Sequence, residues 1–322
     1  MTPAPHLVEL VLEVTNACHH RCVHCSTYGG TAVEGELCQE ERVRVLREAC
    51  ELGLEEPRLL GGDPLVSLSD TAELLAEANR LDVARALIYT SAVERKLEWL
   101  KTFAALRPIR VSAEASIYSA SPLIHDQITQ KAGSLERVLA NSREAVRVGF
   151  DLNWNFVWMK ANFGALESVV ALAWAIGIKR VLVLRLMLNG RARDNRAALQ
   201  IPVEWERRCE SILLDVGERF PGVLLAHSKP LEFQLAKDSR DRRASCSAGR
   251  GQLVVEANGT VLPCVGMKGM REFTIGNVRT ATLAEMFSRS RRMYFDQISR
   301  DFQECPAILY QLTPQLVQLT EV

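Results

Sequence analysis

A regular alternation of strand-like and helix-like segments over the first two thirds of the chain is the feature that most constrains its fold. The strand-like segments are short apolar or alternating stretches at Leu7–Val14, Arg58–Leu60, Ala86–Thr90, Ile109–Ala115, Leu152–Met159 and Arg180–Met187. Stretches with the apolar spacing of a helix separate and follow them, including Asp70–Asn79, Glu94–Leu106, Ser134–Val148, Leu166–Ile176 and Val203–Arg219. Six strand–helix units in a row favour a parallel sheet with crossover helices. We therefore predict an α/β fold, an open or closed (β/α) barrel, with its chemistry beyond the carboxyl ends of the strands.

The chain changes character after residue 236. Residues 237–243 are dense in charge and have no apolar periodicity, which is typical of a linker. Two short strand-like stretches, Gln252–Glu256 and Thr260–Cys264, flank Ala257-Asn258-Gly259 and predict a β-hairpin, and Thr282–Arg292 has the pattern of a helix. We therefore divide the chain into a core at residues 1–236, a linker at 237–243 and a small α+β domain of hairpin plus helix at 244–322.

Charge and cysteine usage narrow the class of protein. Across 322 residues, 39 Lys and Arg balance 39 Asp and Glu, so the chain lacks the basic surplus of a typical nucleic-acid binder. It opens without a basic and then apolar leader, and it has no apolar run of the roughly 18 residues that span a bilayer. We therefore expect a cytoplasmic protein with neither a nucleic-acid nor a membrane partner. In that compartment its nine cysteines favour metal ligands or buried small side chains over disulfides.

Three of the cysteines lie within eight residues, directly after the first predicted strand, in Cys18-His19-His20-Arg21-Cys22-Val23-His24-Cys25. Three thiolates on one loop can hold three corners of a cubane iron–sulfur cluster and leave the fourth iron without a protein ligand. An open iron can bind a substrate or a cofactor. The alternative is a zinc site that uses some of the neighbouring histidines.

The loop resembles the CxxxCxΦC signature of the radical S-adenosylmethionine (SAM) superfamily, with His24 in the aromatic position. Gly61-Gly62-Asp63-Pro64 also resembles the GGEP motif of that superfamily, with Asp in place of Glu. The resemblance implies a partial (β/α)6 TIM-like barrel and a 4Fe-4S cluster on Cys18, Cys22 and Cys25, with SAM on the fourth iron. It further implies an external one-electron donor of the flavodoxin or ferredoxin type. Reductive cleavage of SAM then yields a 5′-deoxyadenosyl radical that abstracts a hydrogen atom from the substrate.

The resemblance also suggests which residues contact SAM. Gly61 and Gly62 permit a close backbone approach to the methionine amino group, and Asp63, followed by Pro64, supplies a hydrogen-bond acceptor nearby. Because Asp stands in place of Glu, a backbone carbonyl is the favoured contact to the amine. Strand-end residues expected at SAM are Ser112, Glu114 and Asn155, and Arg185 resembles an arginine that pairs with the SAM carboxylate. No acid or base can be assigned from the sequence, and the candidates are Lys160, Glu114, Asp126 and Cys38.

The C-terminal cysteines form a second group. Cys246 and Cys264 bracket the predicted hairpin, and this pattern resembles the start of a SPASM or twitch domain, which holds auxiliary iron–sulfur clusters. A full SPASM domain has seven cysteines, whereas only Cys305 follows Cys264 here, so the resemblance supports at most one auxiliary cluster on three thiolates. Its fourth iron would be open or bound by an unidentified residue. The alternative is that these three thiols bind no metal.

The sequence therefore predicts a radical SAM enzyme in which the auxiliary cluster assists an oxidation or a coupling. Our main interpretation is a small natural-product substrate of the sugar or aminocyclitol kind. The chain starts close to its first strand, so we expect no N-terminal peptide-recognition domain of the kind found in many peptide maturases. A ribosomal-peptide maturase that forms crosslinks or thioethers is the alternative.

Two further alternatives are a non-catalytic iron–sulfur redox protein and an RNA-modifying enzyme of the same superfamily. A redox protein would explain the cysteines, but it would not explain Gly61–Pro64 or the six strand–helix units, which disfavours this alternative. The neutral charge of the chain disfavours the RNA-modifying enzyme.

Overall fold

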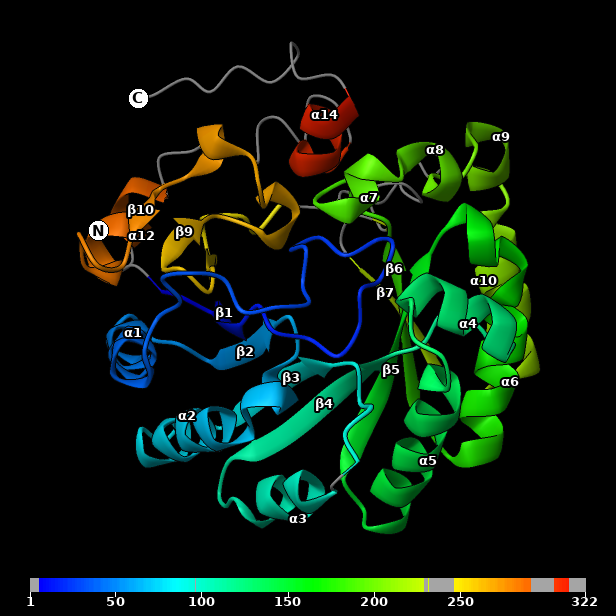
Figure 1. Cartoon of the computed structure of the whole chain (residues 1–322), viewed down its shortest axis with the longest axis horizontal. Helices are drawn as coiled ribbons and strands as arrows, with labels where there is room; N and C mark the ends of the chain where they lie inside the picture. Colours follow the sequence, from blue (N-terminus) through cyan, green and yellow to red (C-terminus); the bar gives the residue numbers. More distant parts are fainter. Residues whose placement is uncertain (1–5, 96, 229–230, 232–245, 291–303, 313–322) are drawn as a thin grey trace.

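The chain folds around one curved sheet of ten strands, in the order β10-β9-β8-β1-β2-β3-β4-β5-β6-β7. The computed structural model describes residues 6–95, 97–228, 231, 246–290 and 304–312. Strands β1 to β7 pair in parallel, and Figure 1 shows their crossover helices along the outside of the curved sheet. The prediction of an α/β fold built on a parallel sheet is confirmed.

Strands β1 to β8 form the parallel part of the sheet, and β9 and β10 extend it in antiparallel pairing. The strands are β1 Glu9–Thr15, β2 Glu56–Gly61, β3 Arg85–Thr90, β4 Arg110–Ser116, β5 Asp151–Trp158, β6 Arg180–Arg185, β7 Leu224–His227, β8 Gln252–Val255, β9 Thr260–Leu262 and β10 Gly276–Asn277. The helices longer than one turn are α1 Gln39–Glu51, α2 Leu68–Arg80, α3 Glu98–Ala105, α4 Pro122–Thr129, α5 Ser134–Arg147, α6 Leu166–Ile176, α10 Cys209–Arg219, α12 Leu283–Ser290 and α14 Pro306–Leu312. Single turns of helix are η1 Pro64–Ser67, η2 Lys160–Ala165, α7 Arg191–Asp194, α8 Arg196–Leu199, α9 Val203–Glu206, η3 Val265–Met267 and η4 Arg271–Phe273.

The two faces of the sheet have opposite character. Side chains alternate along a strand, and on β1 the residues that face the helices, such as Leu10 and Leu12, are fully buried in the main apolar core. Trp154 and Phe156 on β5 join the same core. The other face of the sheet carries ionisable and amide side chains on nearly every strand, namely Glu9, Glu13, Glu56, Arg58, Glu114, Asn153, Asn155 and Arg180. Parallel sheets are usually apolar on both faces, so this polar inner face indicates a site.

The predicted C-terminal hairpin is present and extends the main sheet. Strand β8 pairs in parallel with β1, from Glu9 opposite Gln252 to Leu12 opposite Val255, and β9 then turns back along β8. Helix α12 packs beside α1, where Leu283 N donates to Glu48 Oε2 at 2.7 Å. The predicted linker at residues 237–243 lies outside the described residues. In the described part of the chain the sheet passes from the barrel strands to the hairpin without a break.

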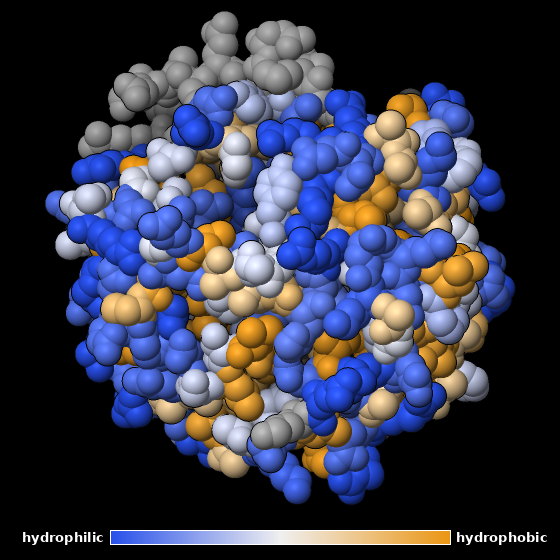
Figure 2. Space-filling model, viewed as in Figure 1, coloured by the Kyte–Doolittle hydropathy of each residue, from blue (hydrophilic) through white to orange (hydrophobic). Residues whose placement is uncertain are grey.

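Several elements differ from the sequence prediction. The helix predicted at 94–106 begins only at Glu98, and the helix predicted at 203–219 is two helices, α9 and α10. The prediction missed β7, α4, α7, α8 and α14, because elements of four to eight residues are too short to show a clear apolar period. The face seen in Figure 2 is mainly hydrophilic with small scattered apolar areas. Within the described residues, the helices are too short or too polar to span a membrane.

Candidate functional site

The N-terminal cysteines lie together on the loop that follows β1. Burial is the largest cause that raises the pKa of Cys22, and the charges of Cys25 and Cys18 raise it further, so the three thiols share one electrostatic environment. Burial, followed by the charge of Asp63, raises the pKa of Cys18 to about 12. Backbone N–H groups point at two of the sulfurs, since Gly29 N donates to Cys25 Sγ at 3.2 Å and His20 N to Cys18 Sγ at 3.4 Å. Buried thiols that bind a metal must release protons to do so, and these N–H donors favour the thiolate that results.

The turn at Gly61 and Gly62 packs directly against the start of the cysteine loop. Gly62 N donates to Thr15 O at 2.6 Å, and Asp63 N donates to Ala17 O at 2.8 Å. A Cβ atom on either glycine would collide with the carbonyl groups of Thr15 or Ala17, and Gly61 also has a positive φ of 144°. The close backbone approach that the structure shows at these glycines is to the β1 end of the loop. The predicted approach to the methionine amino group of SAM stays a prediction.

The Asp63 carboxylate is fully buried and faces the protein interior. Its Oδ1 accepts from Leu65 N at 3.1 Å and from Thr90 Oγ1 at 2.8 Å, and its Oδ2 accepts from Ser91 N at 3.0 Å and from the Ser91 hydroxyl. The side chain therefore ties β2 to the end of β3. Because the Asp63 carboxylate is occupied by these bonds, only the backbone of the turn is left to face a ligand.

The side chains of the three histidines of the loop contact residues outside the loop. His19 Nε2 lies 2.5 Å from Glu94 Oε1, and His20 Nε2 lies 2.9 Å from Ser134 Oγ. His24 is packed edge-on against Tyr118, and burial lowers its pKa to about 4. The loop therefore offers three thiols as its donor set. In the described parts of the chain, no three His, Cys, Asp or Glu side chains are grouped so as to hold a single metal ion.

Open acceptor atoms on the inner face of the sheet fit a hydroxyl-bearing cofactor. Glu114 is buried on β4, where its Oε1 accepts from Arg180 while its Oε2 has no hydrogen-bond partner among the described residues. Asn155 on β5 is paired with Ser116 across the strands, and its buried Oδ1 is likewise open. Ser112 lies on the same inner face two residues before Glu114. Buried polar atoms are normally paired, so these acceptors indicate donors supplied by a ligand, such as ribose hydroxyls.

Arg185 does not join these residues. Val181 and Val183 point into the helix-facing core, and by alternation Arg185 lies on that same side of β6. Its Nη1 donates to Glu304 Oε1 at 2.9 Å, and its Nη2 lies 3.9 Å from Glu206. The structure therefore gives this guanidinium two carboxylate partners within the protein.

Two of the candidate acids and bases, Asp126 and Lys160, lie away from the polar inner face of the sheet. Asp126 accepts from the backbone N–H groups of Gly133 at 2.7 Å and of Leu135 at 3.0 Å, so it braces the start of α5. Lys160 is exposed at the start of η2, beyond the end of β5. Neither the Asp126 carboxylate nor the Lys160 amine is placed with Glu114 and Asn155 on the inner face.

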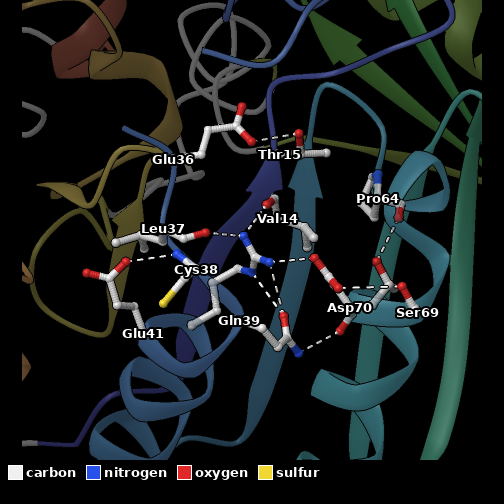
Figure 3. A network of polar contacts seen from close by, with 12 residues as sticks. Val14, Thr15, Glu36, Leu37, Cys38, Gln39, Glu41, Pro64, Ser69 and Asp70 are labelled. Atoms are coloured by element: carbon white, nitrogen blue, oxygen red, sulfur yellow. Dashed lines mark hydrogen bonds and ion pairs between the residues drawn. The ribbon is translucent and has the colours of Figure 1, made fainter. Parts of the chain in front are cut away.

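Cys38, the remaining candidate, is exposed at the N-cap of α1. Figure 3 shows its surroundings, where Cys38 N donates to Glu41 Oε2 at 2.8 Å. Beside it, buried Arg42 donates to the backbone oxygens of Val14 and Leu37 and to Asp70 Oδ2 at 2.6 Å. The network joins the end of β1 to α1 and α2, outside the polar inner face of the sheet.

Glu36 braces the start of the cysteine loop from the same region. Its Oε2 accepts from Thr15 Oγ1 at 2.9 Å, as Figure 3 shows, and its Oε1 accepts from Asn16 N at 2.8 Å and from Val33 N at 2.9 Å. The loop is therefore anchored at its entry and at its exit by one carboxylate. The sequence analysis did not identify Glu36, which carries no motif signal.

The three C-terminal cysteines also lie together, as a second and separate group. The charge of Cys305 raises the pKa of Cys246, that of Cys246 raises the pKa of Cys264, and that of Cys264 raises the pKa of Cys305, although burial is the largest cause in each case. The resulting pKa values are about 11 for Cys246 and about 12 for the other two thiols. Gly266 N donates to Cys264 Sγ at 3.4 Å. Three neighbouring thiols, of which Cys305 is buried and Cys246 and Cys264 are half-buried, fit an iron–sulfur site with three cysteine ligands.

A buried ionic group lies where β1 and β8 end side by side. Lys268 donates from its ammonium to Glu13 Oε1, and Ala257 N donates to Glu13 Oε2 at 3.0 Å. Glu256 follows the last paired residues of the two strands, Leu12 and Val255, and burial together with the Glu13 charge raises the pKa of Glu256 to about 7. Sequence analysis missed this group, because its members are far apart in the chain and ordinary in type.

Two family models match the chain. The model described as the radical SAM superfamily matches residues 12–160, and the SPASM model, described as an iron–sulfur cluster-binding domain, matches residues 246–307. The first match contains Cys18, Cys22 and Cys25, and the second contains Cys246, Cys264 and Cys305.

Several similar proteins are named as PqqA peptide cyclases. The cyclase of Rhizobium meliloti (strain 1021) is 28% identical over 288 residues, which cover 87% of this chain and 73% of the relative. That of Gluconobacter oxydans (strain 621H) is 28% identical over 293 residues, which cover 89% of this chain and 78% of the relative.

The fold is similar to two solved structures. SuiB of Streptococcus suis bound to S-adenosylmethionine superposes with a TM-score of 0.71 and 17% identity, over 88% of this chain and 66% of SuiB. This chain thus spans just under two thirds of SuiB. His6-tagged anSMEcpe with bound AdoMet superposes with a TM-score of 0.67 and 15% identity, over 87% of this chain and 80% of that chain.

Proposed function

We propose that this chain, which belongs to the radical SAM superfamily and carries a C-terminal SPASM domain, is a peptide-modifying enzyme. The observation that carries the proposal is the pair of separate cysteine groups in one continuous fold, one on the loop after β1 and one at the C-terminal hairpin. The relatives named as peptide cyclases support a peptide substrate. A small sugar-like or aminocyclitol-like substrate, which our sequence analysis favoured, has no such support among the comparisons.

The residues of the first site have distinct tasks in this proposal. Cys18, Cys22 and Cys25 are the ligands of a 4Fe-4S cluster, and the backbone of the turn at Gly61 and Gly62 faces the methionine end of SAM. With SAM bound, this cluster supplies a 5′-deoxyadenosyl radical for hydrogen-atom abstraction. The open acceptors Glu114 Oε2 and Asn155 Oδ1 hold the ribose hydroxyls and fix their orientation.

The second site assists the completion of the reaction. Cys246, Cys264 and Cys305 are assigned as ligands of an auxiliary iron–sulfur cluster, which is suited to carry an electron or to bind the substrate. The SuiB structure in complex with the precursor peptide SuiA shares the fold of this chain, and so does anSMEcpe with bound peptide. These complexes support a peptide as the class of substrate.

The test uses the anaerobically reconstituted enzyme with SAM, a reductant and a library of peptides, beside a panel of sugars and aminocyclitols. We expect 5′-deoxyadenosine and a peptide that has lost hydrogen atoms, with deuterium transfer from labelled peptide into 5′-deoxyadenosine. Cys22→Ala is the matched control that should give neither product, because the remaining two thiols cannot replace the third ligand. Deuterium transfer from a sugar or aminocyclitol alone would contradict the peptide assignment.

A further inference from the structure

We propose that the segment that starts at the last residue of β6, residues 185–195, fixes the two cysteine sites relative to each other, with Asn189 and Arg191 as its positioning residues. The segment contacts the first site at one end and the second site at the other. The proposal rests on the proposed function only because it treats both cysteine groups as cluster sites. The contacts that support it are all hydrogen bonds and ion pairs between residues of this chain.

Arg191 holds the cysteine loop through backbone groups. Its Nε donates to Cys22 O at 2.8 Å, its Nη2 donates to Gly29 O at 2.7 Å, and its backbone N donates to Cys25 O at 2.9 Å. Asn195 Nδ2 adds a bond to Val23 O at 2.9 Å. A planar guanidinium donates in fixed directions, so these bonds define where the loop lies relative to the end of β6.

Asn189 holds the second site in the same manner. Its buried side chain donates to Gly266 O at 2.9 Å and to Val265 O at 3.3 Å, on the turn that follows Cys264. Gln311 on α14 donates to Asn189 Oδ1 at 2.6 Å and to Gly266 O at 3.0 Å, and it accepts from Leu188 N at 2.9 Å. The amide pair therefore joins β6, the Cys264 turn and the helix after Cys305.

A third contact reaches the last cysteine. Arg185 at the end of β6 pairs with Glu304, and the same Glu304 Oε1 accepts from Cys305 N at 2.8 Å. Three positions on one segment thus contact the surroundings of Cys22, Cys264 and Cys305.

The segment has little freedom between its two ends. Gly190 separates Asn189 from Arg191, has a φ of 51° and packs so closely on the carbonyls of Cys25 and Ser26 that a Cβ atom would collide with them. Apart from the exposed bond from Asn195, the contacts of Asn189 and Arg191 are buried or half-buried hydrogen bonds, which are costly to leave unpaired. A shift of the turn that follows Cys264 must therefore either move the N-terminal cysteine loop as well or break the hydrogen bonds of Asn189 and Arg191.

Hydrogen exchange of the full-length chain without metal tests the coupling directly. Asn189→Asp has nearly the same shape but loses the bonds donated to Val265 O and Gly266 O. We expect amide exchange to accelerate by at least about fivefold in residues 264–270 and also in residues 18–30. Arg193→Ala on the exposed side of α7 is the matched control and should change neither region. Faster exchange in 264–270 alone would overturn the proposal.

A second measurement keeps the proposal open to refutation if Asn189→Asp does not fold. Gln311→Glu retains the acceptor for Leu188 N and loses both donated bonds, so it should also accelerate exchange in both regions.

In the reconstituted enzyme, pulsed EPR should show a broadened distance distribution between the two clusters for Arg191→Met, with Arg193→Ala unchanged. A distribution for Arg191→Met that matches the wild type would contradict a positioning role. Exchange depends on neither substrate nor radical chemistry, so failure of the proposed function would leave this test valid.

Discussion

Among the described carboxylates, Glu256 has a pKa raised to about 7, so its ionisation near neutral pH differs from that of an ordinary glutamate. It directly follows Val255, which pairs with Leu12 next to Glu13, and Lys268 already donates to Glu13. Burial and the Glu13 charge raise the pKa of Glu256 to about 7, while the Lys268 charge opposes the rise. Two carboxylates therefore share one ammonium group, and Glu256 holds a proton over much of the acidic range.

The stability of the chain should depend on pH at this residue. Between the unfolded pKa of 4.5 and the folded pKa of about 7, the folded chain binds more protons than the unfolded chain. The contribution of Glu256 to the free energy of unfolding therefore falls as pH rises through this window. Glu256→Gln cannot ionise, so we expect it to exceed wild type by on the order of 1 kcal/mol at pH 8, with the difference vanishing near pH 4.5.

Urea denaturation of the metal-free chain at several pH values measures this difference. Glu73→Gln, at an exposed position on α2, is the control for removal of a carboxylate. A constant difference between Glu256→Gln and wild type from pH 5 to pH 8 would show that Glu256 ionises as an ordinary surface glutamate.

At the scale of elements, three parts of the fold hold the cysteine loop. The turn after β2 bonds to Thr15 O and Ala17 O, Glu36 before α1 bonds to Thr15 and Asn16, and Arg191 on α7 bonds to Cys22 O and Gly29 O. Most of these bonds are to the backbone, so the loop has a defined path that does not depend on its side chains. Such a loop presents its thiols in one arrangement before metal binds.

Gly62→Ala should disrupt this arrangement. The added Cβ would collide with the carbonyls of Asn16 and Ala17, so we expect a loss of about 2 kcal/mol or more in stability and weaker iron binding on reconstitution. Gly164→Ala is the matched control, since its Cβ would have nothing within 4 Å. Equal thermal stability and equal iron content in both variants would refute the packing argument.

The elements also show what a sequence can and cannot predict here. Cys18, Cys22 and Cys25 are close in the chain, so their grouping follows from spacing alone, and the strands follow from their apolar patterns. Arg191 bonds to a residue 169 positions away, and Asn189 bonds to one 77 positions away. Such contacts depend on how the sheet closes, which no local pattern encodes. Arg185 was assigned from its strand-end position, but its place in the alternation of β6 turns it toward the helices.

At the scale of the whole molecule, one sheet connects the two cysteine sites. Strand β8 lies directly beside β1, and β1 leads into the first cysteine loop while the β8–β9 hairpin leads to Cys264. The segment that leaves the carboxyl end of β6 contacts both sites as well, from a strand that lies far from β1 in the order of the sheet. These two connections restrict changes in the distance between the two cysteine sites. A fixed distance suits a reaction that uses both sites.

Cys264→Ala should therefore separate the two activities. We expect SAM cleavage to persist without product formation, because the first site keeps its three thiols while the second loses one of its ligands. The ratio of modified peptide to 5′-deoxyadenosine measures this uncoupling and should fall by at least about tenfold. Cys38→Ala, which removes an exposed thiol outside both sites, should leave the ratio unchanged. An unchanged ratio in Cys264→Ala would exclude the second site from the reaction.

Iron and sulfide analysis with Mössbauer and EPR spectra tests most directly whether each cysteine group holds a cluster. The wild type is compared with a Cys18/Cys22/Cys25 triple-alanine variant and a Cys246/Cys264/Cys305 triple-alanine variant, each reconstituted anaerobically with and without SAM. We predict about eight irons for wild type and about four for each variant, with a SAM-dependent spectral change only where the first group is intact. About four irons in wild type and none in the first variant would contradict the two-site account.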